Sequence, residues 1–455
     1  MRLKFPFAGA LFTTLIVACG STPERARLAA APEPDARLLA DALNDALSGK
    51  AARPPEALKQ ATLSDILRMA QTRSPLLAAS YYRWKAAVEF TGTAYEMPVA
   101  MLEYRQFIQA EKANIRLMDE RRSVMLSQMF PNPGKLAARH DMLAAEAGAM
   151  SEEFNAVRRE LRRRVIDAYV NVQALDSRAG ILGQLVTLAR GLEALMEPMV
   201  ATGEASQADL LRMQVEREEM ESDLASLALR RPALLKALEA ASGLALDAAV
   251  TLDALPNVKN AKVPTRAKQL VALEMHPMLQ MSHAQARVAD AKVIESRWMW
   301  VPDFFVAAEW MQMNVPAGMP FENAVAFRVG ITIPWSFEAN AARTNAAEAE
   351  RKAAKLVIAQ KWLDLRAELD AMLFELADAE RMMGLLSASI LPKARRALEL
   401  IRTDFSSGRA KLTDVISAWQ SWLGGELSYV RARAEALKAR AAVESLTGSP
   451  LEDQQ

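Results

Sequence analysis

The sequence predicts a mainly α-helical chain made of two tandem copies of one unit, in which long coiled-coil hairpins are combined with four strands of a membrane β-barrel. Three observations lead to this fold class. Landmark residues recur about 200 positions apart, apolar residues keep a 3,4 spacing over long stretches, and short segments alternate with a period of two. Because each period belongs to one kind of secondary structure, the chain should hold both long helices and strands.

The composition excludes several functional classes. The 455 residues include 56 Lys and Arg against 55 Asp and Glu, a net charge of +1, so no basic excess indicates a nucleic-acid partner. A single cysteine excludes an intrachain disulfide and a Cys-based zinc site. No Ser/His/Asp set, phosphate-binding glycine loop or metal-ligand spacing stands out, so we expect neither an enzyme nor a cofactor.

The N-terminus has the pattern of a bacterial lipoprotein signal. Arg2 and Lys4 precede an apolar segment that ends at Cys19, which would become the acylated first residue of the mature chain. The alternative is an ordinary signal or core segment with an incidental cysteine. Gly20 stands where an Asp would resemble the inner-membrane retention signal, so lipid anchoring in the outer membrane is the expected location. Residues 1–18 are the predicted signal peptide and residues 19–60 the lipidated tether.

The internal duplication sets the domain boundaries. Pro75 aligns with Pro277, Arg139 with Arg343, Gly203 with Gly408 and Gly243 with Gly448, in the same order and with offsets between 202 and 205. Such constant spacing indicates a tandem duplication. We assign residues 61–250 to the first repeat, 251–448 to the second, and 449–455 to a C-terminal tail.

Each repeat contains unusually long helical sequence. A 3,4-spaced apolar ladder runs from Val165 to Met196, and it recurs from Leu365 to Ile390 in the same register shifted by 204 residues. An apolar stripe of this length without internal caps predicts coiled-coil packing. Returning helices that run from Gly203 to Gly243 and from Gly408 to Gly448 would complete two antiparallel hairpins.

Segments with a period of two precede each hairpin. They are Leu102 to Ile108, a weaker one at 123–130, Phe304 to Trp310, and Val325 to Ile333. Each is about as long as a tilted strand that crosses a bilayer. Four strands do not close a barrel, and an open edge is not tolerated in lipid, so several copies of the chain would have to build one barrel.

Four aromatic residues flank the second strand pair. Trp298, Trp300, Trp335 and Phe337 are placed as a membrane-interface girdle would be, on the periplasmic side. A soluble hairpin with ordinary core tryptophans is the alternative.

From Thr62 to Gly448 the chain resembles the TolC-like outer-membrane efflux proteins. The resemblance rests on the duplicated order of helix, strand pair and hairpin and on the turns at 203–211 and 408–416; "FPNPGKLAAR" at 130–139 is similar to a junction of the heavy-metal cation branch. It implies a homotrimer with a twelve-stranded barrel and an α-helical tunnel. The implied partners are a periplasmic adaptor (membrane fusion) protein, an inner-membrane efflux pump and outer-membrane lipid.

The same resemblance assigns roles to the hairpin turns. Gly203 and Gly408 would shape the periplasmic tips that dock the adaptor, and Asp209 and Asp414 would lie at the periplasmic gate. Arg212 and Ser417 stand where that pattern has a second carboxylate, so the family's particular lock is not expected here. Alternatively, both aspartates are ordinary first-turn residues favoured by the helix dipole.

The stretch "HPMLQMSH" offers imidazole and thioether ligands that would suit copper(I): His276, Met278, Met281 and His283. The same slot in the first repeat reads "SPLLAASY", which has no such ligands. We therefore interpret the segment as a helix start with methionines in the core and expect no metal site.

The expected function is passive conduction of substrate from an inner-membrane transporter to the exterior, with metal cations favoured by the junction at 130–139. A drug or type I secretion duct of the same fold is one alternative. A lipid-anchored periplasmic coiled-coil scaffold without transport is the other.

Overall fold

The computed structural model describes residues 23–31, 33–34, 40, 60–106, 120–203, 206–244, 246–247, 250–254, 261–313 and 322–453. The predicted signal peptide and Cys19 lie outside these residues. The chain divides into two compact units, the first formed by Met1–Ala31, Tyr82–Glu153 and Gln280–Gln360 and the second by Pro32–Tyr81, Phe154–Leu279 and Lys361–Gln455.

The order of elements repeats, which confirms the predicted duplication. The first half runs α3 (Leu63–Arg73), α4 (Pro75–Phe90), η1 (Thr91–Thr93), β2 (Met101–Gln106), β3 (Glu120–Phe130), α5 (Pro133–Ala201) and α6 (Gln207–Ser242). The second half runs α7 (Arg266–Glu274), α8 (Pro277–Trp298), β6 (Phe304–Met313), β7 (Glu322–Ile331), α9 (Phe337–Leu385), η2 (Leu386–Ile390), α10 (Leu391–Ser406) and α11 (Leu412–Thr447).

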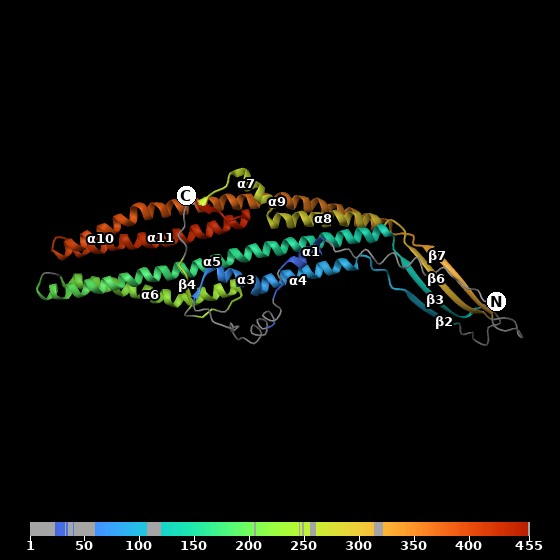
Figure 1. Ribbon diagram of the computed structural model, residues 1–455, viewed down its shortest axis with the longest axis horizontal. Helices are drawn as coiled ribbons and strands as arrows, with labels where there is room; N and C mark the ends of the chain where they lie inside the picture. Colours follow the sequence, from blue (N-terminus) through green and yellow to red (C-terminus); the bar gives the residue numbers. More distant parts are fainter. Residues whose placement is uncertain are drawn as a thin grey trace. The chain divides into compact units, whose positions relative to one another are not determined.

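The first unit contains the predicted strands as one antiparallel sheet in the order β2-β3-β6-β7. Figure 1 shows these strands side by side. The register aligns Leu102, Leu126, Ala308 and Phe327 in one row across the sheet. Among the described residues, β2 and β7 each pair on one side only, so the sheet has two free edges.

A short helix, α1 (Pro23–Ala30), lies within the segment that the sequence predicts as a tether. It packs in the first unit, where Arg25 lies 3.5 Å from Glu89 and Arg27 lies 4.0 Å from Glu152. Burial raises the pKa of Glu24, and the nearby Arg27 opposes that rise. The sequence analysis predicted a tether here because the segment is rich in proline and charged residues. The helix depends on contacts with residues that are distant in the sequence.

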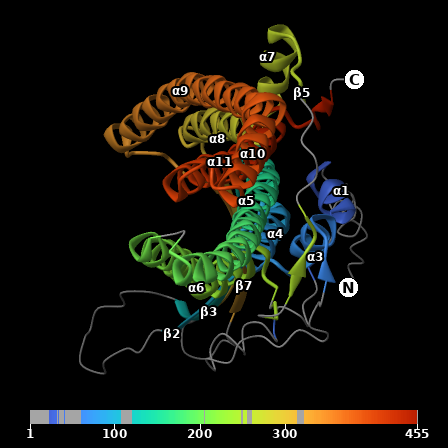
Figure 2. The same ribbon diagram turned by 90° about the vertical axis from the view of Figure 1, so that its left-hand side faces the viewer.

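The second unit contains the two hairpins, in which α5 from Phe154 onward pairs with α6 and α10 pairs with α11. The hairpins lie side by side in both views (Figures 1 and 2). The returning helices end where the sequence predicts. Gly243 and Gly448 adopt left-handed conformations with φ of 71° and 73°, and each donates its N–H to the carbonyl four residues earlier. This geometry is the usual glycine C-cap.

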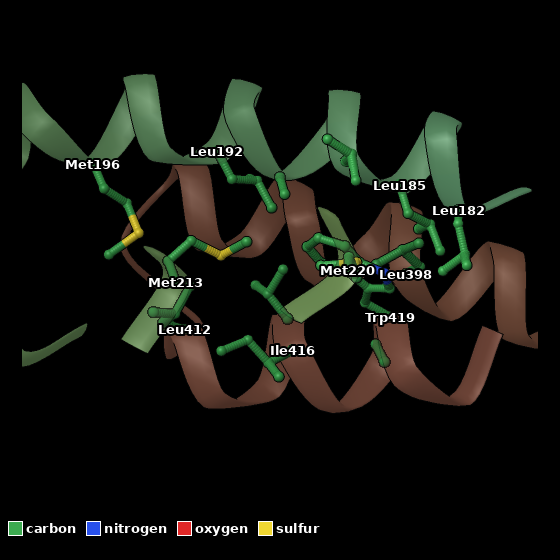
Figure 3. Packing of buried hydrophobic residues seen from close by; sticks show 14 of the residues in the cluster. Leu182, Leu185, Leu192, Met196, Met213, Met220, Leu398, Leu412, Ile416 and Trp419 are labelled. Atoms are coloured by element: carbon green, nitrogen blue, oxygen red, sulfur yellow. The ribbon is translucent and has the colours of Figure 1, made fainter. Parts of the chain in front are cut away.

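A continuous apolar core joins the hairpins near their turns. Figure 3 shows Leu182, Leu185, Leu192 and Met196 of α5 directed toward Met213 and Met220 of α6 and toward Leu398, Leu412, Ile416 and Trp419 of the second hairpin. One 18-residue window of α5 has a mean hydropathy of 1.2, which by length and composition alone would suit a membrane span. The burial of the α5 ladder against three other helices explains that apolar content as coiled-coil core.

The predicted ladder of the second hairpin is wrong at its last rung. The sequence predicts Ile390 as a buried rung, yet its side chain is 39% exposed. Residues Leu386–Ile390 form a π-helical turn between α9 and α10, so the next inward position is Leu391. A π turn adds one residue per turn, and every later rung moves by one position.

Two-residue bridges connect the beginning and the end of each half in the second unit. β1 (Gln60–Ala61) pairs with β4 (Thr251–Leu252), and β5 (Ala261–Lys262) pairs with β8 (Glu452–Asp453). Each half therefore returns to its starting point before the chain continues or ends.

Candidate functional site: membrane sheet and hairpin tips

One face of the four-stranded sheet is apolar and exposed. Phe327 and Val329 on β7 are 79% and 76% exposed. The same face carries Leu102, Tyr104, Leu126, Phe304, Val306, Trp310, Val325 and Ile331, each more than a third exposed. In water such a patch would be costly, whereas a strand surface that faces lipid needs this composition.

The opposite face carries charge that the sequence analysis did not single out. Glu309 of β6 is 1% exposed and contacts Arg328 of β7, whose guanidinium also lies 3.7 Å from the sulfur of Met125 on β3. On β2, Arg105 pairs with Glu103 at 3.0 Å. Strand alternation already placed these residues opposite the apolar ones, so the signal was present in the sequence.

The predicted interface aromatics occupy different environments. Trp335 is 75% and Phe337 56% exposed, and the rings of Trp300 and Phe337 lie 6.1 Å apart. Trp298 is half-buried and covers Gly134, where an added Cβ would come within 2.2 Å of the indole. Trp298 therefore packs against the start of α5, while Trp335 remains open to its surroundings.

The junction at 130–139 is held by specific contacts. Lys135 pairs with Asp303 at 2.7 Å, and the other carboxylate oxygen of Asp303 accepts the N–H of Asn132 at 2.9 Å. Asp303 also donates its own N–H to Thr332 Oγ1 at 2.8 Å. Asn132 and Lys135 thus fasten the start of α5 to Asp303 in the loop that precedes β6.

Each hairpin turns at a glycine in the left-handed region. Gly203 has a φ of 81° and Gly408 a φ of 73°, and nothing lies within 4 Å of an added Cβ at either position. The need for glycine is therefore a backbone requirement, since other residues adopt these angles at a cost. Both predicted tip glycines lie in the turns.

The two predicted gate aspartates lie in the first turns of the returning helices. Asp414 accepts the N–H of Lys411 through Oδ2 at 3.1 Å and completes a capping box. Asp209 lies 4.0 Å from Arg212, and Ser206 caps that helix by accepting the N–H of Ala208 at 3.2 Å. Both carboxylates are placed favourably for the helix dipole, as the alternative interpretation of the sequence predicts.

The two turns share one small cavity. Its lining includes Met196, Ser206 and Asp209 from the first hairpin and Phe405, Gly408 and Lys411 from the second. Next to it, Arg409 pairs with Asp404 at 3.0 Å. A carboxylate and a lysine therefore line the same opening at the end of the unit.

Ion pairs cross-link the helices of the first hairpin above its turn. Arg217 of α6 lies 2.9 Å from both Glu193 of α5 and Glu221, and Arg190 of α5 lies 2.8 Å from Glu221. Hydrogen bonds from Arg190 and Arg217 lower the pKa of Glu221.

The histidines of "HPMLQMSH" have separate environments. His276 is 6% exposed and accepts the N–H of Met278 through Nδ1 at 3.3 Å, as a residue at a helix start does. Burial lowers its pKa to about 4, and Arg159 and Lys361 add to this effect. His283 is exposed. In the first half, Ser74 fills the slot of His276 and accepts the N–H of Leu77 at 3.4 Å.

Comparison with known proteins agrees with this geometry. The model of the outer membrane efflux protein family matches residues 118–244 and 271–449, about two thirds of the chain. The chain belongs to the outer membrane efflux protein family, whose members are channel components and not enzymes. No curated protein sequence matches it.

Solved structures share the fold at low sequence identity. The outer membrane protein VceC from Vibrio cholerae has a TM-score of 0.71 and 17% identity, over 86% of this chain and 97% of VceC. The open state of the MtrE outer membrane channel of Neisseria gonorrhoeae has a TM-score of 0.70 and 16% identity, over 86% and 90%. CusC, whose crystal structures concern the conformational changes that accompany folding and transmembrane channel formation, has a TM-score of 0.71 and 15% identity, over 85% of this chain and 92% of CusC. The predicted fold class is thereby confirmed.

Proposed function

We propose that three copies of the chain form the outer-membrane exit duct of a tripartite efflux pump. The observation that carries this proposal is the sheet with two free edges and an apolar exposed face. Unpaired strand edges are too costly in hydrocarbon, so each edge must pair with another chain. Three chains of four strands would close a twelve-stranded barrel, with the face of Glu309 and Arg328 toward a wet lumen.

The hairpin tips are the proposed contact with the rest of the pump. A periplasmic adaptor protein docks at the turns of Gly203 and Gly408, and the inner-membrane pump delivers substrate through it. Asp209 and Asp414 then stand at the entrance, where a ring of carboxylates from three chains would attract cations. The shared lining of the two turns supports a common entrance.

Lipidation of Cys19 is the proposed anchor, and the position of α1 supports it. An added Cβ at Gly148 of α5 would lie 3.7 Å from Glu24, and Gly148 is 15 residues after Pro133, roughly 22 Å along the helix. Arg27, three residues after Glu24, lies beside Glu152, which is four residues farther along α5 than Gly148. From its N-terminal end, α1 therefore runs away from the sheet. The N-terminal end of α1 is therefore the end nearer the sheet, which is the proposed membrane side.

Metal cations are the proposed substrate, on the resemblance of the 130–139 junction alone. Deleting the gene and deleting its pump partner should then give the same sensitivity, to copper or silver and not to drugs. Drug sensitivity without metal sensitivity would favour the drug duct. Loss of one exported polypeptide would favour type I secretion.

The duct itself is tested by assembly. Material extracted from outer membranes should run as a heat-resistant trimer and conduct ions in planar bilayers. A protein that is monomeric and soluble once Cys19 is replaced would contradict the duct and favour the periplasmic scaffold.

A further inference from the structure

The second unit has a groove between α5, α6 and α11 that is lined by positive charge. Its volume is about 510 Å³, within the range of roughly 300–1,000 Å³ that is usual for small-molecule sites. Four cationic side chains and one carboxylate line it: Arg178, Arg230, Arg431, Lys438 and Glu435. The lining therefore carries a net charge of +3, whereas the whole chain carries +1. The groove is a local concentration of positive charge.

The three arginines of the groove are not neutralised by the protein. In the part of the chain that the structure describes, no ion pair or hydrogen bond involves the side chains of Arg178, Arg230 and Arg431, and all three residues are exposed. Lys438 donates to the neutral amide oxygen of Asn171 at 2.5 Å. Like charges that line one groove repel each other, so an anion bound between them is favoured.

The floor of the groove is apolar. Leu175 of α5 and Leu227 of α6 are 7% and 8% exposed, and three half-buried side chains complete the floor: Leu234, Leu427 and Val430. A ligand that suits both surfaces has an anionic head and an apolar body. Arginine is well suited to the head, because its planar guanidinium binds two oxygens of an oxyanion at once.

The groove lies on the side of α5 that faces away from the short bridges. Tyr169 and Gln173 donate hydrogen bonds to backbone carbonyls in β4 and directly after it, at 2.8 and 2.6 Å. Asn171 and Arg178 of the groove lie about half a turn around the helix from these two residues. β4 pairs with β1, which follows the predicted tether. Because the proposed lipid on the tether must reach the membrane outside a closed duct, the opposite side of α5 faces the tunnel.

We propose that this groove is an anion-binding site on the tunnel wall, for an amphipathic organic anion with a carboxylate or sulfonate head. Arg178, Arg230 and Arg431 hold the head, and the apolar body lies on the leucine floor. The site rests on the proposed function for its place in the tunnel and goes beyond it in its ligand, which need not be the exported substrate. In three assembled copies the grooves form a cationic band, and a bound anion neutralises charge that repels a passing metal cation.

The test measures binding and does not need conduction. The probe is anilinonaphthalene sulfonate, a fluorescent amphipathic anion, and phenylnaphthylamine is the neutral comparison because it has the same rings without the sulfonate. The full chain is titrated with each probe in nanodiscs of zwitterionic lipid, with empty nanodiscs as the blank. We expect one saturable site per chain for the sulfonate, with an affinity that falls at high salt because exposed charges are screened.

Substitutions at exposed positions separate the groove from the rest of the surface. Arg178→Gln combined with Arg431→Gln should weaken sulfonate binding by about tenfold or more, since each arginine supplies a hydrogen bond to a charged group. Lysine at the same two positions should keep most of the affinity. Glu435→Gln should tighten binding by up to about fivefold, because it removes the single carboxylate of the lining. Arg396→Gln combined with Arg402→Gln is the matched control, which removes two exposed arginines of α10 outside the groove.

Each outcome decides for or against the site. Equal weakening by the control pair, or an equal dependence of phenylnaphthylamine binding on the two groove arginines, would overturn it. If a second copy covers the groove, the groove variants lower the dissociation temperature of the trimer and leave sulfonate binding unchanged, which also overturns it. A conducting trimer without the sulfonate site rejects the site and leaves the duct. Saturable sulfonate binding to a monomer that does not conduct rejects the duct and leaves the anion site.

Discussion

Arg328 of β7 contacts Glu309 of β6 on the sheet face opposite the exposed apolar side chains, and Glu309 is 1% exposed. A carboxylate buried to this degree needs a partner of opposite charge. Removing the partner destabilises a protein by more than the intact ion pair stabilises it, because the remaining charge is then buried without compensation. The contact joins two strands of the second half and, through Met125, a strand of the first half. It is therefore placed to hold the sheet together from its polar side.

Arg328→Ala should destabilise the assembled sheet. It leaves Glu309 without its guanidinium, at a cost of about 1–3 kcal/mol per chain. The temperature at which the proposed trimer dissociates in detergent gels should fall. Arg105→Ala is the control, because Arg105 and Glu103 are 42% and 39% exposed and such pairs contribute at most about 1 kcal/mol. Equal effects of the two substitutions would contradict the role of burial.

His276 should make the second unit sensitive to acid. Its pKa falls from an ordinary 6.5 to about 4 in the folded chain, so the unfolded chain binds a proton more readily. Above pH 6.5 the ring is neutral in both the folded and the unfolded chain. As the pH falls toward 4, the unfolded chain is protonated first, and the free energy of unfolding falls by about 3 kcal/mol in total.

The test of this dependence uses the residue of the first half. His276→Ser introduces the side chain found at Ser74, which accepts a similar hydrogen bond. The drop in melting temperature between pH 7.5 and pH 5 should be smaller in this variant than in the parent. His283→Ser, at an exposed position, should leave the drop unchanged. An unchanged drop in His276→Ser would remove this histidine as the cause.

Much of the fold was predictable because the same landmark residues and periodic patterns occur once in each half of the chain. Gly243 and Gly448 end their helices as predicted, and the strand alternation gives the apolar face correctly. The ladder fails at Ile390 because a one-residue insertion in a helix leaves the local pattern intact and changes only the phase of the later rungs. Comparison of the offsets, 204 at Arg343 and 205 at Gly408, held the information.

Other features were not predictable because they depend on contacts across the chain. The helix α1 is too short and polar to be predicted from its own sequence. It is held by ion pairs with Glu89 and Glu152. The burial of His276 depends on its surroundings, which include Arg159 and Lys361. Sequence assigned the tip glycines their backbone role, while the charges of Asp209 and Asp414 have two interpretations that only a functional measurement separates.

Trp335 should lie in the lipid interface of the assembled protein. It is 75% exposed beyond the end of β7, and tryptophan favours the headgroup level. In vesicles with brominated lipids, Trp335→Phe should remove part of the quenchable fluorescence of the eight tryptophans. Trp84→Phe, at a residue that is 3% exposed, should remove only unquenched signal. If the quenched fraction of the tryptophan fluorescence is the same before and after Trp335→Phe, Trp335 does not lie in the lipid interface.

Asp414 has a capping role and a proposed gate role, and two substitutions separate them. Asp414→Ala removes both the charge and the acceptor for Lys411 N–H, at a cost of about 1 kcal/mol to the helix start. Asp414→Asn keeps an oxygen acceptor and removes only the charge. If the ion pairs and hydrogen bonds of the two carboxylates hold the entrance closed, and their loss outweighs the weaker attraction of cations, both variants should raise single-channel conductance in planar bilayers, and Asp209→Ala combined with Asp414→Ala should raise it further. If Asp414 is only a cap, Asp414→Asn conducts like the parent. Unchanged conductance in the double variant would remove both aspartates from the gate, while the glycine turns and the docking proposal would stand on their own evidence.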